Sequence, residues 1–374
     1  MTANSIFNAY IDANLVLLLA ALLWFAARVL LNRTSFRQAG LMQLQMVYAI
    51  CLAVALAPLV IAGHAVVTQA GLLGSGYSPS LSDYALAQFL NGRFQMAPSE
   101  FEALWMSRTV FTQQVTTLGS PLGIMVAAVL ATGFSIYAAR LLRNALKVRS
   151  VIRGGFLWRS LRGIDIVLTD RVDVPFSTRG MGRRYIVLPS GLLSQADDLR
   201  IAIAHELQHM RQGDLGWEIA VEVLRPVFFW NPGFAYLKRE IEELRELACD
   251  QQVLTRRRIG LQDYCDCLLR VCDNAMGRNR PAQIIVPTVP LVRPEGGRRA
   301  ARFLKRRVLS MLTQAQAAPS RLVTGLMILP FVAAISFGSL ASQSNSADWS
   351  QDRLMLSTIV NLERLDQRTL ATRY

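Results

Sequence analysis

The sequence has 374 residues, of which 52% are hydrophobic, with a mean hydropathy of +0.30 and a formal net charge of +14. A soluble chain of this length would distribute its apolar residues periodically over one to three domains. Here they are concentrated in long blocks, which argues against a wholly soluble protein.

Four segments reach the ~20 mostly apolar residues that a membrane-spanning helix needs. They cover residues 15–31, 46–67, 118–142 and 319–341. Arg28 lies near the end of the first segment, where we expect its long side chain to reach the lipid headgroups. No basic residue precedes this segment and no small-residue cleavage site follows it, so we predict a retained span and not a cleaved signal peptide.

Basic residues indicate the orientation, because Lys and Arg accumulate on the cytoplasmic side of spans. They lie between the first two spans, after the third and before the fourth: Arg33, Arg37, Arg140, Arg143, Lys147, Arg149, Arg153, Lys305, Arg306, Arg307 and Arg321. We therefore predict that residues 143–318 are cytoplasmic, and that loop 68–116, tail 342–374 and both termini lie outside. Because these charges crowd beside the spans, they favour contact with the lipid bilayer, and we expect no direct nucleic-acid binding.

The segment between the third and fourth spans begins with a predicted basic helix and a sheet. The helix is expected over residues 144–162. Three short β-prone runs, separated by turn residues, follow it and predict a small antiparallel sheet from residues 163–168, 172–176 and 185–188.

Helices follow this sheet. Ser194 and Asp197 have the spacing of a capping box, so a helix is predicted from Ala196 to Gln212, ending near Gly213. Further helices are expected over 215–230, from after Gly233 to about Leu254, and over 298–312 before the fourth span. The predicted fold class is thus a mainly α integral membrane protein with four transmembrane helices and a cytoplasmic α+β domain. Its cysteines would be reduced there, so no disulfide framework is expected.

The helix at 196–212 carries His205-Glu206-Leu207-Gln208-His209. Residues i and i+4 share a helix face, so His205 and His209 can aim at one ion while Glu206 projects beside it. Zinc suits two imidazoles, a carboxylate and a water molecule, and Glu206 could then act as general base. Such a pattern also arises by chance on solvated helices. The chain has only three histidines, however, and two of them belong to this motif.

A third ligand must come from elsewhere, and the acidic residues after residue 240 are the candidates. Glu246 and Asp250 share a face, so Glu246 can complete a site for one zinc ion per chain. Asp250 can accept a hydrogen bond from a ligand imidazole N–H. Glu242 stays open as an alternative ligand, and an ordinary solvated acidic face is the alternative without function. Four residues stay open as oxyanion stabilisers: Tyr236, Arg239, Arg245 and Tyr264.

Several motifs in order resemble the BlaR/MecR-type antirepressor zinc metalloproteases, which are integral membrane gluzincins. They are Val174-Pro175-Phe176-Ser177, Ile186-Val187-Leu188-Pro189, His205-Glu-x-x-His209, Phe229-Trp230-Asn231-Pro232 and Glu246-Leu-Ala-Cys-Asp250. The resemblance covers residues 10–341. It implies zinc ligands at His205, His209 and Glu246, a general base at Glu206 and an orienting residue at Asp250. It also implies a sheet edge that receives substrate as an added strand, at Tyr185, Ile186, Val187, Leu188 and Pro189.

This resemblance implies a protease in a bacterial plasma membrane that cleaves a cytoplasmic transcriptional repressor, and itself, after an external signal. One departure is that only 33 residues (342–374) follow Ala341, without a lysine. We therefore expect no penicillin-binding sensor domain with its S-x-x-K motif, and the signal or sensor partner stays unknown. Two alternatives are a housekeeping CAAX-type or stress-type membrane zinc protease, and a non-catalytic transducer with a structural metal site. A homodimer is left open.

Two further segments carry predictions. Residues 277–300, rich in Pro and Gly, are expected to form a loop that either gates the active site as a pseudo-substrate or serves as a plain tether. Residues 348–368 are expected to form an amphipathic helix.

Overall fold

The computed structural model describes residues 2–70, 81–93, 96–161, 163–180, 182–257, 259–277, 289–290, 298–312, 320–342 and 351–371. The chain forms two compact units. Unit 1 comprises Met1–Trp24, Ala49–Thr132 and Leu326–Tyr374, and unit 2 comprises Phe25–Tyr48 and Gly133–Gly325.

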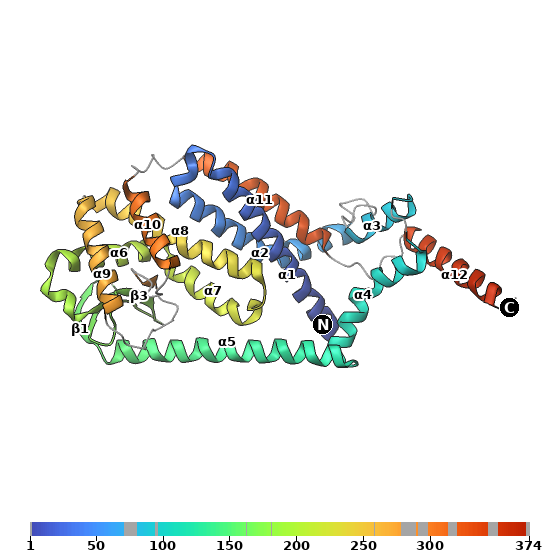
Figure 1. Ribbon diagram of the computed structural model, residues 1–374, viewed down its shortest axis with the longest axis horizontal. Helices are drawn as coiled ribbons and strands as arrows, with labels where there is room; N and C mark the ends of the chain where they lie inside the picture. The colour runs from blue at the N-terminus through green and yellow to red at the C-terminus, as the bar shows by residue number, and fades with distance from the viewer. Residues whose placement is uncertain are drawn as a thin grey trace. The chain divides into compact units, whose positions relative to one another are not determined.

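Among the described residues, four helices are long and apolar enough to cross a membrane, and they contain most of the four segments predicted from the sequence. They can be followed by colour and label in Figure 1 as α1 (Ala3–Leu31), α2 (Gly40–Gln69), α5 (Pro121–Arg153) and α11 (Arg321–Ala341). The first three extend well beyond the apolar blocks, because helix continues into the flanking polar residues.

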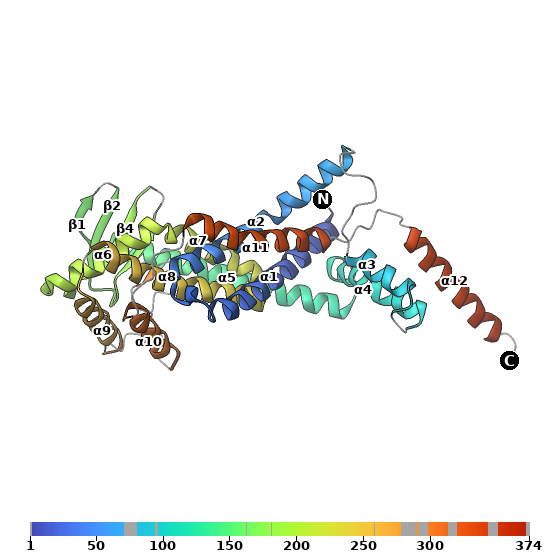
Figure 2. The same ribbon diagram turned by 90° about the horizontal axis from the view of Figure 1, so that it is seen from above.

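Unit 1 contains a cluster of three further helices. They are α3 (Leu81–Leu90), α4 (Pro98–Thr116) and α12 (Gln351–Ala371), which can be followed in Figure 2. Their shared core includes Phe89, Phe101 and Val360. Glu363 of α12 accepts hydrogen bonds from the backbone N–H and hydroxyl of Ser99, which satisfies donors at the start of α4. The helix predicted over residues 348–368 therefore exists, and it packs on α3 and α4.

Unit 2 contains one mixed sheet. Its strands are β1 (Phe156–Leu161), β2 (Ile164–Thr169), β3 (Phe176–Arg179), β4 (Arg184–Pro189) and β5 (Val289–Pro290), in the order β1-β2-β4-β3-β5. The β2–β4 pair is parallel and the other pairs are antiparallel, so the prediction of an antiparallel sheet is wrong at that pair.

The sheet also starts earlier than predicted, because β1 occupies the end of the expected basic helix. A side chain at Gly155 would place its Cβ 2.3 Å from Val167 Cγ1, so only glycine permits the close turn from α5 into β1. The strand expected over residues 172–176 begins instead at Phe176.

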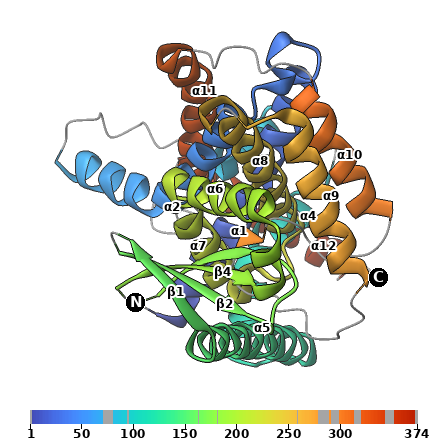
Figure 3. The ribbon, with the colours of Figure 1, turned by 90° about the vertical axis from the view of Figure 1, so that its left-hand side faces the viewer.

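The two faces of the sheet pack against different helices, as Figure 3 shows with α5 on one side and α6 on the other. Side chains alternate along a strand, so Val167 and Val187 face the end of α5 while Ile166 and Ile186 face α6 (Ala196–Gln212). The sheet therefore supports α6 from beneath.

The remaining helices of unit 2 are α7 (Asp214–Phe228), α8 (Pro232–Arg257), α9 (Leu261–Gly277) and α10 (Arg298–Leu312). Helices α6 and α10 have the predicted bounds, whereas α9 was not predicted. The capping-box prediction is wrong: Gln195 is the N-cap without a side-chain hydrogen bond, and the Ser194 hydroxyl donates to the Gly191 carbonyl. All five cysteines are free thiols, as expected.

Unit 2 also includes the end of α1, the 3-10 turn Ser35–Gln38 and the start of α2. Arg28 forms an ion pair with Glu240 of α8 at 3.5 Å and donates a hydrogen bond to Gln43. The expectation that Arg28 reaches the headgroups is therefore wrong, because its guanidinium is bound by Glu240 and by the buried Gln43.

Candidate metal centre

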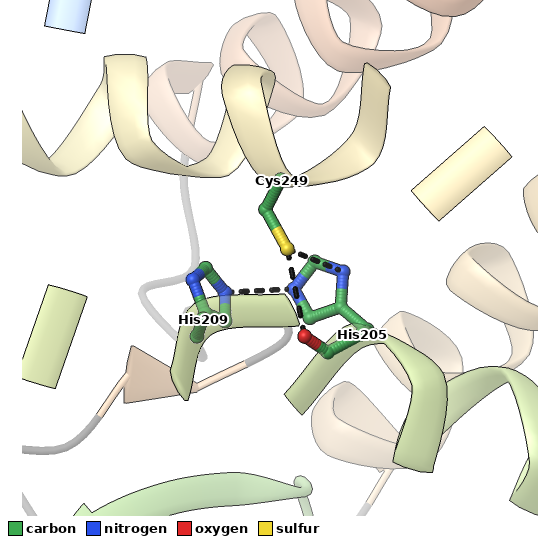
Figure 4. A group of neighbouring side chains, drawn as sticks. All are labelled: His205, His209 and Cys249. Atoms are coloured by element: carbon green, nitrogen blue, oxygen red, sulfur yellow. Dashed lines mark hydrogen bonds between the residues drawn. The ribbon is translucent and has the colours of Figure 1, made fainter. Parts of the chain in front are cut away.

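Helix α6 brings the two histidines of the HExxH motif to one point. His205 and His209 are fully buried, and their Nε2 atoms lie 3.0 Å apart. Figure 4 shows these nitrogens facing each other from successive turns of α6. The helix stops just afterwards at Gly213, whose φ of 78° is the left-handed cap conformation and whose N–H donates to the His209 carbonyl.

Glu246 of α8 completes this arrangement. Its Oε2 lies 3.6 Å from His205 Nε2 and its Oε1 lies 3.6 Å from His209 Nε2. Ligand atoms about 2.0–2.2 Å from a tetrahedral zinc ion are separated from one another by about 3.3 Å. The three side chains therefore have the chemistry and the spacing of a zinc site.

Charge states at this point also fit a metal. Burial lowers the pKa of His209 well below its usual range, which leaves the neutral imidazole that a metal requires. Burial alone would raise the pKa of Glu246, but the Arg307 guanidinium and the two imidazoles lower it to about 2, so the carboxylate is ionised.

Glu206 is fully buried, and neither of its carboxylate oxygens has a hydrogen-bond partner among the described residues. Burial raises its pKa well above the ordinary value, while the neighbouring Ser177 hydroxyl and Arg245 oppose the rise. Buried carboxylates without a partner are rare, because their desolvation is not offset. A metal ion with a water molecule beside Glu206 would satisfy it.

The outer nitrogen of each imidazole is held by a carboxylate, one directly and one through a tyrosine. His209 Nδ1 lies 2.8 Å from Asp214 Oδ2. His205 Nδ1 lies 2.7 Å from the Tyr264 hydroxyl, which donates to Asp250 Oδ1 at 2.7 Å. Asp250 itself lies 3.6 Å from His205 Nδ1, so the direct hydrogen bond expected from the sequence is replaced by a relay through Tyr264.

Arg307 of α10 also belongs to this hydrogen-bond network, through contacts with Asp250 and Glu246. Its Nε and Nη2 each donate to Asp250 at 2.7 Å, and its Nη1 lies 3.4 Å from Glu246 Oε2. The fork geometry of a guanidinium suits such a two-point contact. One cation thus orders both acidic residues that α8 contributes.

Cys249 also lies close enough to be considered as a ligand. Its Sγ and one ring nitrogen each of His205 and His209 lie within 4.8 Å of one another, so these atoms are close enough to bind one metal ion. The thiol contacts Nδ1 and the carbonyl oxygen of His205 (Figure 4). Burial raises the pKa of the Cys249 thiol well above its usual range, which disfavours the thiolate that metals bind.

The other residues left open by the sequence have different partners. Glu242 accepts a hydrogen bond from Lys238 at 2.7 Å. Arg239 pairs with Glu243 at 3.0 Å, and Arg245 is buried against Glu218. Tyr264 lies behind the His205 ring, which removes it from the oxyanion candidates.

The expected substrate-receiving edge at Tyr185, Ile186, Val187, Leu188 and Pro189 is wrong. These residues form β4, which is paired with β2 on one side and β3 on the other, so it offers no free edge. The neighbouring strand β3 is also paired on both sides, because its Phe176 and Ser177 pair with β5. The predicted gating loop at 277–300 falls mainly on residues 278–288 and 291–297, outside the described residues.

Two comparisons with known proteins bear on this geometry. Residues 9–288 match the model of the family described as BlaR1 peptidase M56. The regulatory protein BlaR1 of Bacillus licheniformis is 33% identical over 78 residues, which cover 21% of this chain and 13% of that protein.

Proposed function

We propose, from the premise that the chain belongs to the BlaR1 peptidase M56 family, that it is a membrane-embedded zinc metalloendopeptidase of the signal-transducing type. The observation that carries the proposal is the convergence of His205, His209 and Glu246 beside the buried carboxylate of Glu206. The family membership favours this regulatory type over a CAAX-type or stress-type housekeeping protease.

His205, His209 and Glu246 would hold the metal in this proposal. When bound, zinc supplies Lewis-acid chemistry: it polarises a peptide carbonyl and makes water more acidic. Glu206 would accept a proton from the attacking water and return it to the leaving amine, a role suited to a carboxylate whose pKa is raised by burial. Asp214 and the Tyr264–Asp250 pair would fix the orientation of the imidazoles.

For the substrate, we infer a cytoplasmic regulatory protein, with a transcriptional repressor as the leading candidate and the chain itself as a second. The relative BlaR1 is itself named a regulatory protein, which supports a regulatory role for this chain. A substrate strand could pair with β3 only by displacing β5, which occupies the outer edge of that strand. Ser177 of β3 neighbours Glu206, and α6 packs against this strand.

A first experiment combines metal analysis with cleavage of a candidate repressor by the purified chain. Glu206→Gln should keep one zinc ion per chain while cleavage falls roughly 10²- to 10⁴-fold, as when a general base is removed. Undiminished cleavage by this variant would contradict the role of Glu206, whereas zinc binding without any cleavage by the parent chain would favour the alternative of a non-catalytic transducer with a structural metal.

A second pair of variants tests the third ligand. Glu246→Gln should leave the purified chain with much less than one zinc ion. Glu242→Gln is the matched control, since Glu242 lies one helical turn earlier on α8 and is bonded to Lys238. Full zinc occupancy in Glu246→Gln would show that another residue, such as Cys249, completes the site.

A further inference from the structure

The start of α2 is part of the metal-binding unit. Gly40–Tyr48 belongs to unit 2, whereas the rest of this apolar helix belongs to unit 1. A Cβ atom at Gly40 would lie 3.3 Å from the backbone nitrogen of Ala248, so α2 closely approaches α8 there. Nearby, the Gln251 side chain donates to the Gln38 carbonyl at 2.8 Å.

One side chain of α2 reaches toward a histidine of the metal centre. The hydroxyl of Tyr48 donates to Asp214 Oδ1 at 3.2 Å, and the other oxygen of Asp214 lies 2.8 Å from His209 Nδ1. Asp214 and His209 are both fully buried. A helix with the length and composition of a membrane span is therefore two hydrogen bonds away from a candidate metal ligand.

The Tyr48 ring is itself held in place. It stacks on Trp217 of α7 with ring centroids 4.3 Å apart and an interplanar angle of 3°. Because Trp217 lies one turn after Asp214 on the same helix, the stack fixes the distance between the phenol and the carboxylate. The hydroxyl therefore has a defined target and is not a chance contact at the end of a mobile side chain.

We propose that Tyr48 is a positioning residue for the metal centre, acting through Asp214 on the imidazole of His209. The Asp214 carboxylate has two oxygens to satisfy in a buried setting, and His209 occupies only one of them. Tyr48 satisfies the other, which stops the carboxylate from rotating and so fixes the His209 ring. The start of a membrane helix thereby sets the affinity of the site for its metal, and a displacement of α2 lowers that affinity.

The inference rests on the proposed function only in requiring that the site bind zinc, so zinc affinity is the readout. The full-length chain is purified in detergent and its zinc dissociation constant is measured by competition with a chelator. Removing partners behind a metal ligand typically weakens binding by about 10- to 100-fold. We expect Tyr48→Phe, which retains the stacking ring, to weaken binding by about tenfold.

Tyr137→Phe is the matched control. Tyr137 lies on another candidate span, α5, and stacks on Phe229 of unit 2 at 5.5 Å, but no contact among the described residues joins its hydroxyl to the metal centre. The zinc affinity of the Tyr137→Phe variant should equal that of the parent chain. Unfolding of the metal-free chains provides the second control, because Tyr48→Phe should melt like the parent without zinc and gain less stability when zinc is added.

A double variant identifies the route. In an Asp214→Asn background, which should itself bind zinc more weakly, adding Tyr48→Phe should cause no further loss, since both changes break one chain of hydrogen bonds. Independent losses, or parent-like affinity in Tyr48→Phe, would overturn the positioning role and leave the proposed function intact. A parent chain that binds no zinc at all would overturn both.

Discussion

Arg307 lies buried on α10 with its guanidinium against Asp250 and Glu246. In the sequence it stands among the basic residues before the fourth span and indicates only orientation. Whether a charge is buried depends on partners far along the chain, which spacing does not reveal. The ligand set is different, because His205 and His209 are related by local helical periodicity.

The residues on the Nδ1 side of the two histidines show the same contrast between local and distant signals. Asp250 was readable because it lies four residues after Glu246 on one helix. Asp214 was missed, although an acid directly after the glycine that ends α6 is a usable signal. Tyr264 lies on α9, a helix the sequence did not predict, so its contact with His205 could not be foreseen.

We predict that Arg307→Met strongly lowers the free energy of unfolding of the protein. The change leaves two buried carboxylates without their cation, a situation that typically costs about 3–5 kcal/mol. Arg306→Met is the matched control, since Arg306 is 40% exposed and its pair with Glu243 resembles surface ion pairs worth about 0–1 kcal/mol. Thermal unfolding of both variants in detergent checks this, and equal midpoints would refute the assigned role of Arg307.

Among the elements, the four spans, α6 and α10 were predicted better than the strands, whereas α3, α4 and α9 were not predicted. The end of α6 follows from Gly213, a local signal, whereas its start was predicted from a capping box that does not form. The parallel pairing of β2 with β4 depends on which distant segment lies alongside, and no local pattern encodes that choice. Similarly, β1 lies where the sequence predicts the end of a basic helix. Its side chains are almost all exposed, so burial imposes no apolar alternation that would mark a strand.

The close approach of α2 to α8 at Gly40 predicts that a larger side chain there is harmful. Gly40→Val should push the two helices apart, since even a single Cβ there meets the Ala248 backbone at 3.3–3.5 Å. We expect lower thermal stability and weaker zinc binding. Gly63→Val on the same helix is the control, because a Cβ there has no atom within 4 Å. Identical behaviour of the two variants would contradict the packing.

For the whole molecule, the sequence predicted a protease domain bounded at residues 143–318. Unit 2 also contains Phe25–Tyr48, which the sequence assigns to two spans and their connecting loop. Apolar residues that face lipid and apolar residues that face protein have the same composition. Hydropathy therefore locates these helices but cannot say where along them the surroundings change.

The proposed sidedness belongs to the whole molecule as well. We predict that unit 2 faces the cytoplasm and that the α3–α4 region lies outside, as the distribution of basic residues indicates. Cysteine introduced at the exposed Asn91 should react with an impermeant thiol reagent in intact cells, whereas cysteine at the exposed Ser194 should not. The parent chain gives the background of the five native thiols, and the opposite labelling would invert the topology.

Helix α2 has a length that bears on its two surroundings. Its 30 residues extend for about 45 Å at 1.5 Å per residue, whereas the hydrocarbon layer is ~30 Å thick. About 15 Å is left over, close to the length of the Gly40–Tyr48 stretch that packs in unit 2. The remainder of α2 therefore has about the length that is needed to cross the hydrocarbon layer, with no residues to spare. A change in bilayer thickness must then be accommodated by a tilt of α2 or by a displacement of the turn that carries Tyr48.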